Sequence, residues 1–193
     1  MNLPNKLTVA RIIAVPFFII MFLTEHYFLA LIIFILASLT DLLDGKIARA
    51  RNLVTNFGKI MDPLADKILV YSAFCLLVAD ESHLVPAWMF AVILAREFLV
   101  AGMRTVAASE GIVIAADMSG KIKTVLQMIA VPLLILVKAT GDPVYSLPSD
   151  GMPSNPTNWI ALLGQVFLWG ALIMTVISGG EYVIKNKALF KEK

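Results

Sequence analysis

The feature that most constrains the fold is a series of apolar runs, each close to 20 residues long. A run of about 20 apolar residues can cross the hydrocarbon core of a bilayer as a helix. Hydrophobic residues make up 59% of the 193-residue chain, whereas soluble domains average about 45–50% apolar residues. The sequence therefore predicts an all-α membrane protein, and its length favours a single domain over residues 1–193.

Six transmembrane helices are predicted from these runs and the breaks between them. The predicted ranges are Leu7–Leu23, Phe28–Leu43, Leu64–Ala79, Pro86–Ala107, Gly120–Lys138 and Trp159–Ile184. The segment 141–158 contains four prolines together with glycine, serine and asparagine, so it is predicted to be a loop. The predicted architecture is a polytopic helix bundle.

Composition also narrows the function classes. Cys75 is the only cysteine, which excludes an intramolecular disulfide or a cysteine cluster. The net charge of +2 gives no support for binding to nucleic acid. The N-terminus lacks a short apolar region followed by a small-residue cleavage site, so it does not read as a signal peptide.

Positive charge is distributed unevenly between the two sides of the predicted bundle. With six spans, both termini fall on the same side. Of the 16 Lys and Arg residues, only Lys138 lies near the other side. Because the cytoplasmic side of membrane proteins carries the excess of Lys and Arg, both termini are predicted to be cytoplasmic.

Four aspartates interrupt the apolar pattern on this predicted cytoplasmic side. Asp41 and Asp44 are three residues apart, and Asp62 and Asp66 are four apart, so on helices each pair projects from one face. Unpaired carboxylates at membrane depth are costly, but divalent cations would make the cluster favourable. Carboxylate oxygens suit Mg²⁺ or Mn²⁺, and no Cys or His lies nearby to suggest zinc. The pattern predicts a site for two divalent cations, a common device for displacement at phosphorus.

Small residues occur in helical register with the aspartates. Gly45 and Ala48 lie one turn beyond the first pair, and Gly58 lies one turn before the second. They leave room for a ligand close to the backbone, and Arg49 can fork onto phosphate oxygens. Alternatively, the aspartates pair with nearby lysines and arginines at a solvated rim. That alternative does not explain why the glycines are in register.

These residues resemble the sequence motif of the CDP-alcohol phosphotransferase family. The match covers Asp41-x2-Asp44-Gly45-x2-Ala48-Arg49-x8-Gly58-x3-Asp62-x3-Asp66. The segments NLPNKLTVARIIAVP, AREFLVAGMRTVAASEG and GKIKT look like the bacterial phosphatidylglycerolphosphate synthase branch of this family. The resemblance implies a six-helix enzyme of the bacterial cytoplasmic membrane, usually a homodimer, that uses two divalent metals.

The resemblance also implies roles for individual residues. Asp41, Asp44 and Asp62 would be metal ligands, and Asp66 would be both a ligand and the general base. The residues implied to bind CDP-diacylglycerol are Asn5, Thr8, Gly45, Arg49 and Thr55.

The fourth predicted helix carries Arg96 and Glu97 inside an apolar run, and an ionisable residue there suggests a functional site. Arg104 follows eight residues later on the same side of the helix, and Lys121 and Lys123 open the fifth predicted helix. These four cations suit a small acceptor that bears a phosphate. The alternative is that these cations anchor the topology. Glu97 is expected to orient Arg96.

The resemblance to this family and branch, together with the cations, implies transfer of the phosphatidyl group of CDP-diacylglycerol to sn-glycerol 3-phosphate. The products are phosphatidylglycerol phosphate and CMP. The same chemistry with phosphatidylglycerol, inositol phosphate or serine as the acceptor stays open. A cation transporter is a distant alternative, which is disfavoured because the external halves of the helices are almost wholly apolar.

Overall fold

The computed structural model describes residues 3–50, 56–112, 114, 117–141 and 155–187. Within these ranges, the side chains of residues 3–4, 41–50, 56–60, 62–63 and 66 lie outside the description. The described residues form six α-helices and no β-strand. The helices are α1 (Leu3–Leu23), α2 (Tyr27–Ala50), α3 (Asn56–Ala79), α4 (Ala87–Ser109), α5 (Met118–Ala139) and α6 (Pro156–Lys185).

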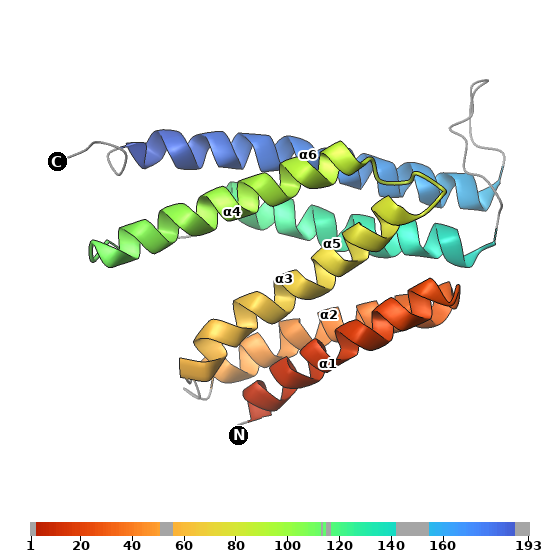
Figure 1. Cartoon of the computed structure of the whole chain (residues 1–193), viewed down its shortest axis with the longest axis horizontal. Helices are drawn as coiled ribbons and strands as arrows, with labels where there is room; N and C mark the ends of the chain where they lie inside the picture. The colour runs from red at the N-terminus through yellow and green to blue at the C-terminus, as the bar shows by residue number, and fades with distance from the viewer. Residues whose placement is uncertain (1–2, 51–55, 113, 115–116, 142–154, 188–193) are drawn as a thin grey trace.

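Successive helices run in alternate directions (Figure 1). The N-terminal ends of α1, α3 and α5 and the C-terminal ends of α2, α4 and α6 lie on the left of the view. We call this side of the bundle the charged end, because the lysines and arginines cluster in the segments that meet there. The remaining helix ends form the opposite end. Both chain termini therefore belong to the charged end.

The predicted helices are confirmed, but several extend beyond their apolar runs. α1 begins at Leu3, α2 continues to Ala50, and α3 begins at Asn56. The apolar length is set by the thickness of the hydrocarbon core, whereas backbone hydrogen bonding can continue into polar residues. As a result, the four aspartates lie on helical backbone.

The chain is a membrane protein by the character of its helices and its surface. α1, α5 and α6 are long and apolar enough to cross a bilayer, while α2 and α3 contain the shorter apolar segments Tyr27–Thr40 and Lys67–Ala79. The outer surface exposes large apolar side chains, such as Phe17 at 56% and Val176 at 60%. Six complete crossings stay a prediction, because α4 carries three charged residues along its length.

The hydrophobic core occupies the half of the bundle toward the opposite end. Phe18 contacts Phe34 with ring centroids 5.9 Å apart, and both side chains are almost completely buried. α5 packs closely on α6, where a Cβ on Gly164 would lie 2.8 Å from Leu134 Cδ2. Small residues at such contacts let membrane helices approach each other. The bundle is thus tightly packed at this end.

The opposite end also contains one polar cluster. Lys138 Nζ lies 3.0 Å from Asp80 and 5.1 Å from the centre of the Tyr27 ring. Burial raises the pKa of Asp80, but hydrogen bonds from Ser82 and the nearby Lys138 ammonium outweigh it, so this pKa is lower than usual. The cluster explains how the one lysine away from the charged end is accommodated.

Candidate active site

The predicted metal ligands lie on two helix ends that belong to the charged end. Asp41 and Asp44 are on α2, and Asp62 and Asp66 are on α3. Their side chains lie outside the described part of the structure, so their roles as metal ligands stay predictions. The same holds for three predicted donor-binding residues. Gly45 and Arg49 lie on α2, and Thr55 lies outside the described residues.

The first turns of α1 bury three polar residues spaced three apart. Asn5 is 7% exposed, Thr8 is 0% exposed and Arg11 is 2% exposed. α1 packs against α2 and α3, the two helices that carry the aspartates. The family resemblance implies that Asn5 and Thr8 bind the donor, whereas Arg11 was expected only to contribute to the charge asymmetry that sets the orientation. Its burial in a membrane helix now marks it as a candidate site residue as well.

A cavity of about 800 Å³ opens among α3, α4, α5 and α6. All four cations predicted to bind the acceptor line it, and they come from two helices: Arg96, Arg104, Lys121 and Lys123. Six further polar residues also line it: Lys67, Glu97, Thr105, Asp117, Thr124 and Tyr182. The structure therefore gathers the predicted acceptor residues into one space.

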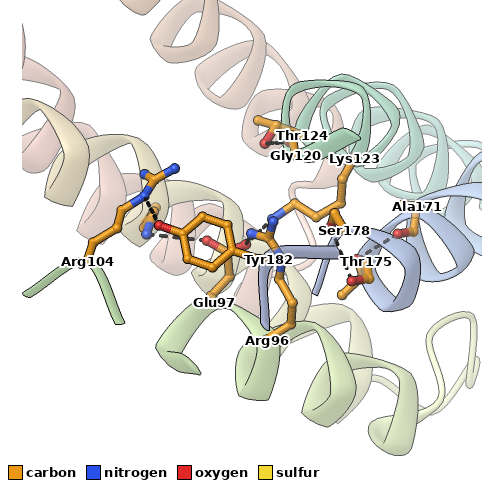
Figure 2. Close-up of polar contacts among 11 residues, drawn as sticks. Arg96, Glu97, Arg104, Gly120, Lys123, Thr124, Ala171, Thr175, Ser178 and Tyr182 are labelled. Carbon is orange, nitrogen blue, oxygen red and sulfur yellow. Dashed lines mark hydrogen bonds and ion pairs between the residues drawn. The ribbon is translucent and has the colours of Figure 1, made fainter. Parts of the chain in front are cut away.

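Glu97 is the centre of a charge cluster in this cavity. Its Oε1 accepts a hydrogen bond from Arg96 NH1 at 2.8 Å and another from Lys123 Nζ (Figure 2). Its Oε2 lies 3.3 Å from Lys67 Nζ. One carboxylate on α4 is thus shared by cations from α3, α4 and α5. Because three positive charges meet one negative charge, the cluster keeps an excess of positive charge.

Arg96 is held in place by two glycines on neighbouring helices. A Cβ on Gly120 of α5 would lie 3.2 Å from Arg96 NH2, and a Cβ on Gly179 of α6 would lie 3.1 Å from Arg96 Cγ. Any larger residue at either position would press on the arginine. The two glycines therefore define the space in which the guanidinium meets Glu97.

Arg104 and Lys121 differ from the cations bound by Glu97. Arg104 Nε donates a hydrogen bond to the Tyr182 hydroxyl at 3.1 Å, and its guanidinium carbon lies 5.6 Å from the centre of that ring. Lys121 forms no ion pair with any residue in the described part of the chain. Both residues are exposed to the cavity. They are therefore the cations best placed to meet an anionic ligand.

Polar contacts at the rim of the cavity join the start of α5 to the end of α6. Lys185 Nζ lies 3.4 Å from Asp117 and 3.7 Å from Glu181. Ser119 donates a hydrogen bond of 3.0 Å to Glu181. These contacts are exposed, so each contributes little to stability, but together they connect the two helices at the cavity mouth.

Two residues of this site, Lys67 and Tyr182, were not predicted from the sequence. Lys67 directly follows Asp66, and that adjacency was an available signal. Tyr182 lies 78 residues from Arg104 in the chain, and only the packing of α6 on α4 brings them together. No local pattern could have indicated that contact.

Residues 1–177 match the family described as CDP-alcohol phosphatidyltransferase. This match covers most of the chain, which therefore belongs to the CDP-alcohol phosphatidyltransferase family. The all-helical bundle and its long apolar helices agree with that membership.

Curated relatives extend the comparison to individual enzymes. The CDP-diacylglycerol–glycerol-3-phosphate 3-phosphatidyltransferase of Bacillus subtilis is 44% identical, over 96% of this chain and 95% of the relative. A protein of the same name from Rickettsia typhi is 38% identical, over 98% of this chain and 99% of the relative. Another of that name, from Shigella flexneri serotype 5b, is 32% identical over 97% and 96%.

Proposed function

We propose that this protein transfers the phosphatidyl group of CDP-diacylglycerol to sn-glycerol 3-phosphate, which gives phosphatidylglycerol phosphate and CMP. The observation that carries this proposal is the 44% identity to an enzyme with that name over almost the whole of both chains. The cationic cavity supports a phosphate-bearing acceptor.

The proposed proton and bond changes use the roles that the family resemblance implies for the aspartates. Asp66 accepts the proton of the acceptor hydroxyl, and the resulting oxygen attacks the phosphorus that carries diacylglycerol. The bond from this phosphorus to the oxygen shared with CMP breaks, and CMP leaves. The family is generally dependent on divalent cations. Four carboxylates on two helices fit two hard cations such as Mg²⁺ or Mn²⁺, which would neutralise charge on the diphosphate. The residues that would hold them are Asp41, Asp44, Asp62 and Asp66.

The donor nucleotide would lie between α1 and the α2–α3 pair. The buried positions of Asn5 and Thr8 on α1 support this placement, because α1 packs on both aspartate-bearing helices. The proposed donor-binding residues are Asn5, Thr8, Gly45, Arg49 and Thr55.

The acceptor phosphate would bind in the cavity, where Arg104 and Lys121 contact it directly. Arg96 and Lys123, held by Glu97, add positive charge beneath it. Lys67 lines the same cavity and directly follows the proposed base Asp66. One small molecule could therefore place its phosphate among the cations and its hydroxyl near the base.

We further propose that the enzyme is a homodimer of the bacterial cytoplasmic membrane with both termini in the cytoplasm. The shared position of both termini at the charged end (Figure 1) supports this orientation. The distribution of Lys and Arg supports it as well. The active site would then open toward water-soluble glycerol 3-phosphate.

The proposal is tested with the purified full-length enzyme, CDP-diacylglycerol, Mg²⁺ and a panel of acceptors. CMP release and the lipid product are measured for sn-glycerol 3-phosphate, phosphatidylglycerol, inositol phosphate and serine. We expect turnover with glycerol 3-phosphate and much less with the others. A different preferred acceptor would replace the assignment, and no CMP release with any acceptor would overturn the reaction itself.

Substitutions then test the two substrate sites separately. Because charged hydrogen bonds contribute about 1.5–3 kcal/mol, Arg104→Ala or Lys121→Ala should raise the KM for glycerol 3-phosphate by roughly 10- to 100-fold. The KM for CDP-diacylglycerol should change much less, and Arg49→Ala should show the reverse pattern. An unchanged acceptor KM in both Arg104→Ala and Lys121→Ala would place the acceptor elsewhere.

A further inference from the structure

Tyr182 is a buried residue of the acceptor cavity, and its hydroxyl contacts Arg104. It lies in the last turns of α6, is 1% exposed, and packs in a small cluster with Val100 and Met103 of α4. A buried hydroxyl without a partner is unfavourable. Here the hydroxyl accepts the hydrogen bond from Arg104 Nε at 3.1 Å, as Figure 2 shows.

This contact leaves the other end of the Arg104 guanidinium available. Tyr182 takes the Nε–H, and no residue in the described ranges accepts a hydrogen bond from NH1 or NH2. Guanidinium groups bind phosphate best through two parallel N–H bonds in a fixed plane. A long arginine side chain on an exposed helix face does not keep such a plane by itself, because its rotamers are many. The Tyr182 hydroxyl and ring restrict it at two points.

We propose that Tyr182 is a positioning residue for the acceptor: it fixes the Arg104 guanidinium so that NH1 and NH2 meet the acceptor phosphate as a pair. This inference rests on the proposed function, in which Arg104 binds that phosphate. The phenol ring packs against side chains of α4, the helix that also carries Arg104. The distance between the two residues is therefore set by the packing of α6 on α4.

The test uses Tyr182→Phe in the purified full-length enzyme, because phenylalanine keeps the buried ring and removes only the hydroxyl. We expect the KM for glycerol 3-phosphate to rise about 3- to 10-fold, the range for one uncharged hydrogen-bond partner, while the KM for CDP-diacylglycerol stays unchanged. In an Arg104→Ala background, Tyr182→Phe should have no further effect, because interacting residues are non-additive. Tyr27→Phe is the matched control, since this ring lies at the opposite end, with its centre 5.1 Å from Lys138 Nζ.

Each other outcome is decisive. If Arg104→Ala raises the acceptor KM and Tyr182→Phe does not, the inference fails and the acceptor site stands. If neither substitution changes this KM, the acceptor site proposed at Arg104 fails with it. An equal effect of Tyr182→Phe with and without Arg104, or an equal effect of Tyr27→Phe, would show that Tyr182 does not act through the arginine.

A second variant keeps the inference testable if Tyr182→Phe does not fold. Arg104→Lys retains the positive charge but loses both the Nε donor to Tyr182 and the paired terminal donors. We expect its acceptor KM to approach that of Arg104→Ala. A wild-type KM in Arg104→Lys would show that charge alone suffices and that positioning by Tyr182 is not needed.

Discussion

Replacement of Glu97 by glutamine keeps the size of the side chain but removes its negative charge, and it should strongly lower the free energy of unfolding. Its carboxylate is the shared counter-ion of two nearly buried cations, since the side chains of Arg96 and Lys123 are 13% and 4% exposed. Breaking a buried ion pair by removing one partner costs about 3–5 kcal/mol, because an uncompensated charge is left in a poorly solvated place. Lys67, at 42% exposed, should add little to this loss.

The expected effect on thermal stability is large enough to measure. For a chain of this length, 1 kcal/mol corresponds to about 2–4 °C in Tm, so Glu97→Gln should lower Tm by about 6–20 °C. The assay is thermal unfolding in detergent at a fixed scan rate, with tryptophan fluorescence as the readout. Glu181→Gln is the matched control, because Glu181 pairs with Lys185 at the exposed rim and its loss should cost about 0–1 kcal/mol.

A second substitution separates the loss of a counter-ion from the loss of packing. In Glu97→Gln/Lys123→Met, the buried ammonium is removed together with its partner, so part of the lost stability should return. The reasoning is refuted if Glu97→Gln lowers Tm no more than Glu181→Gln. It is also refuted if the double variant is less stable than Glu97→Gln alone.

Three further predictions concern the metal site, the topology and pH. Asp44→Asn should abolish CMP release at saturating Mg²⁺ while the protein still inserts and folds, and activity above about a tenth of wild type would contradict its role as a ligand, given the several kcal/mol a metal supplies. Single cysteines at Glu81 and at Asn186, in a cysteine-free background, should react with an impermeant reagent from opposite sides of sealed vesicles; labelling from the same side would exclude the proposed topology. Since the pKa of Asp80 is lowered in the folded protein, its pairing with Lys138 should stabilise the fold above the unfolded-state pKa of aspartate, near 3.9, and this stability should disappear as pH falls through the lower folded value. The Tm difference between wild type and Asp80→Asn should thus be full at neutral pH and shrink below about pH 4; a difference that does not change with pH would contradict this.

Helices of this protein are predictable where their physical cause is local. An apolar run is visible in sequence, so the central parts of all six helices were expected. The aspartate pairs were expected on helices, but the bounds of these polar extensions, such as the start of α3 at Asn56, were not, because hydropathy carries no information about helices outside the hydrocarbon core.

The acceptor cavity was predictable only in its chemical character. Arg96 and Arg104 stand out as charges on an apolar helix, and the structure places both in one cavity with Lys121 and Lys123. Which of these cations pair with Glu97 and which stay available to a ligand was not predictable. It depends on which of them reach Glu97, and this is decided by the packing of α3 and α5 around α4. The space for Arg96 likewise depends on glycines from two other helices.

The closed packing at the opposite end has a consequence for the membrane around the enzyme. Phe18, Phe34 and Leu77 are 0–1% exposed there, so the interior of that half of the bundle is packed with apolar side chains, and the polar cluster of Lys138 and Asp80 lies beyond them. Among the residues that the structure describes, a phosphate-bearing headgroup made in the cavity would find no continuous polar route to the opposite end. In the proposed orientation, the anionic lipid product would therefore be delivered to the cytoplasmic leaflet alone. Growth of the outer leaflet would depend on a separate lipid-translocating protein.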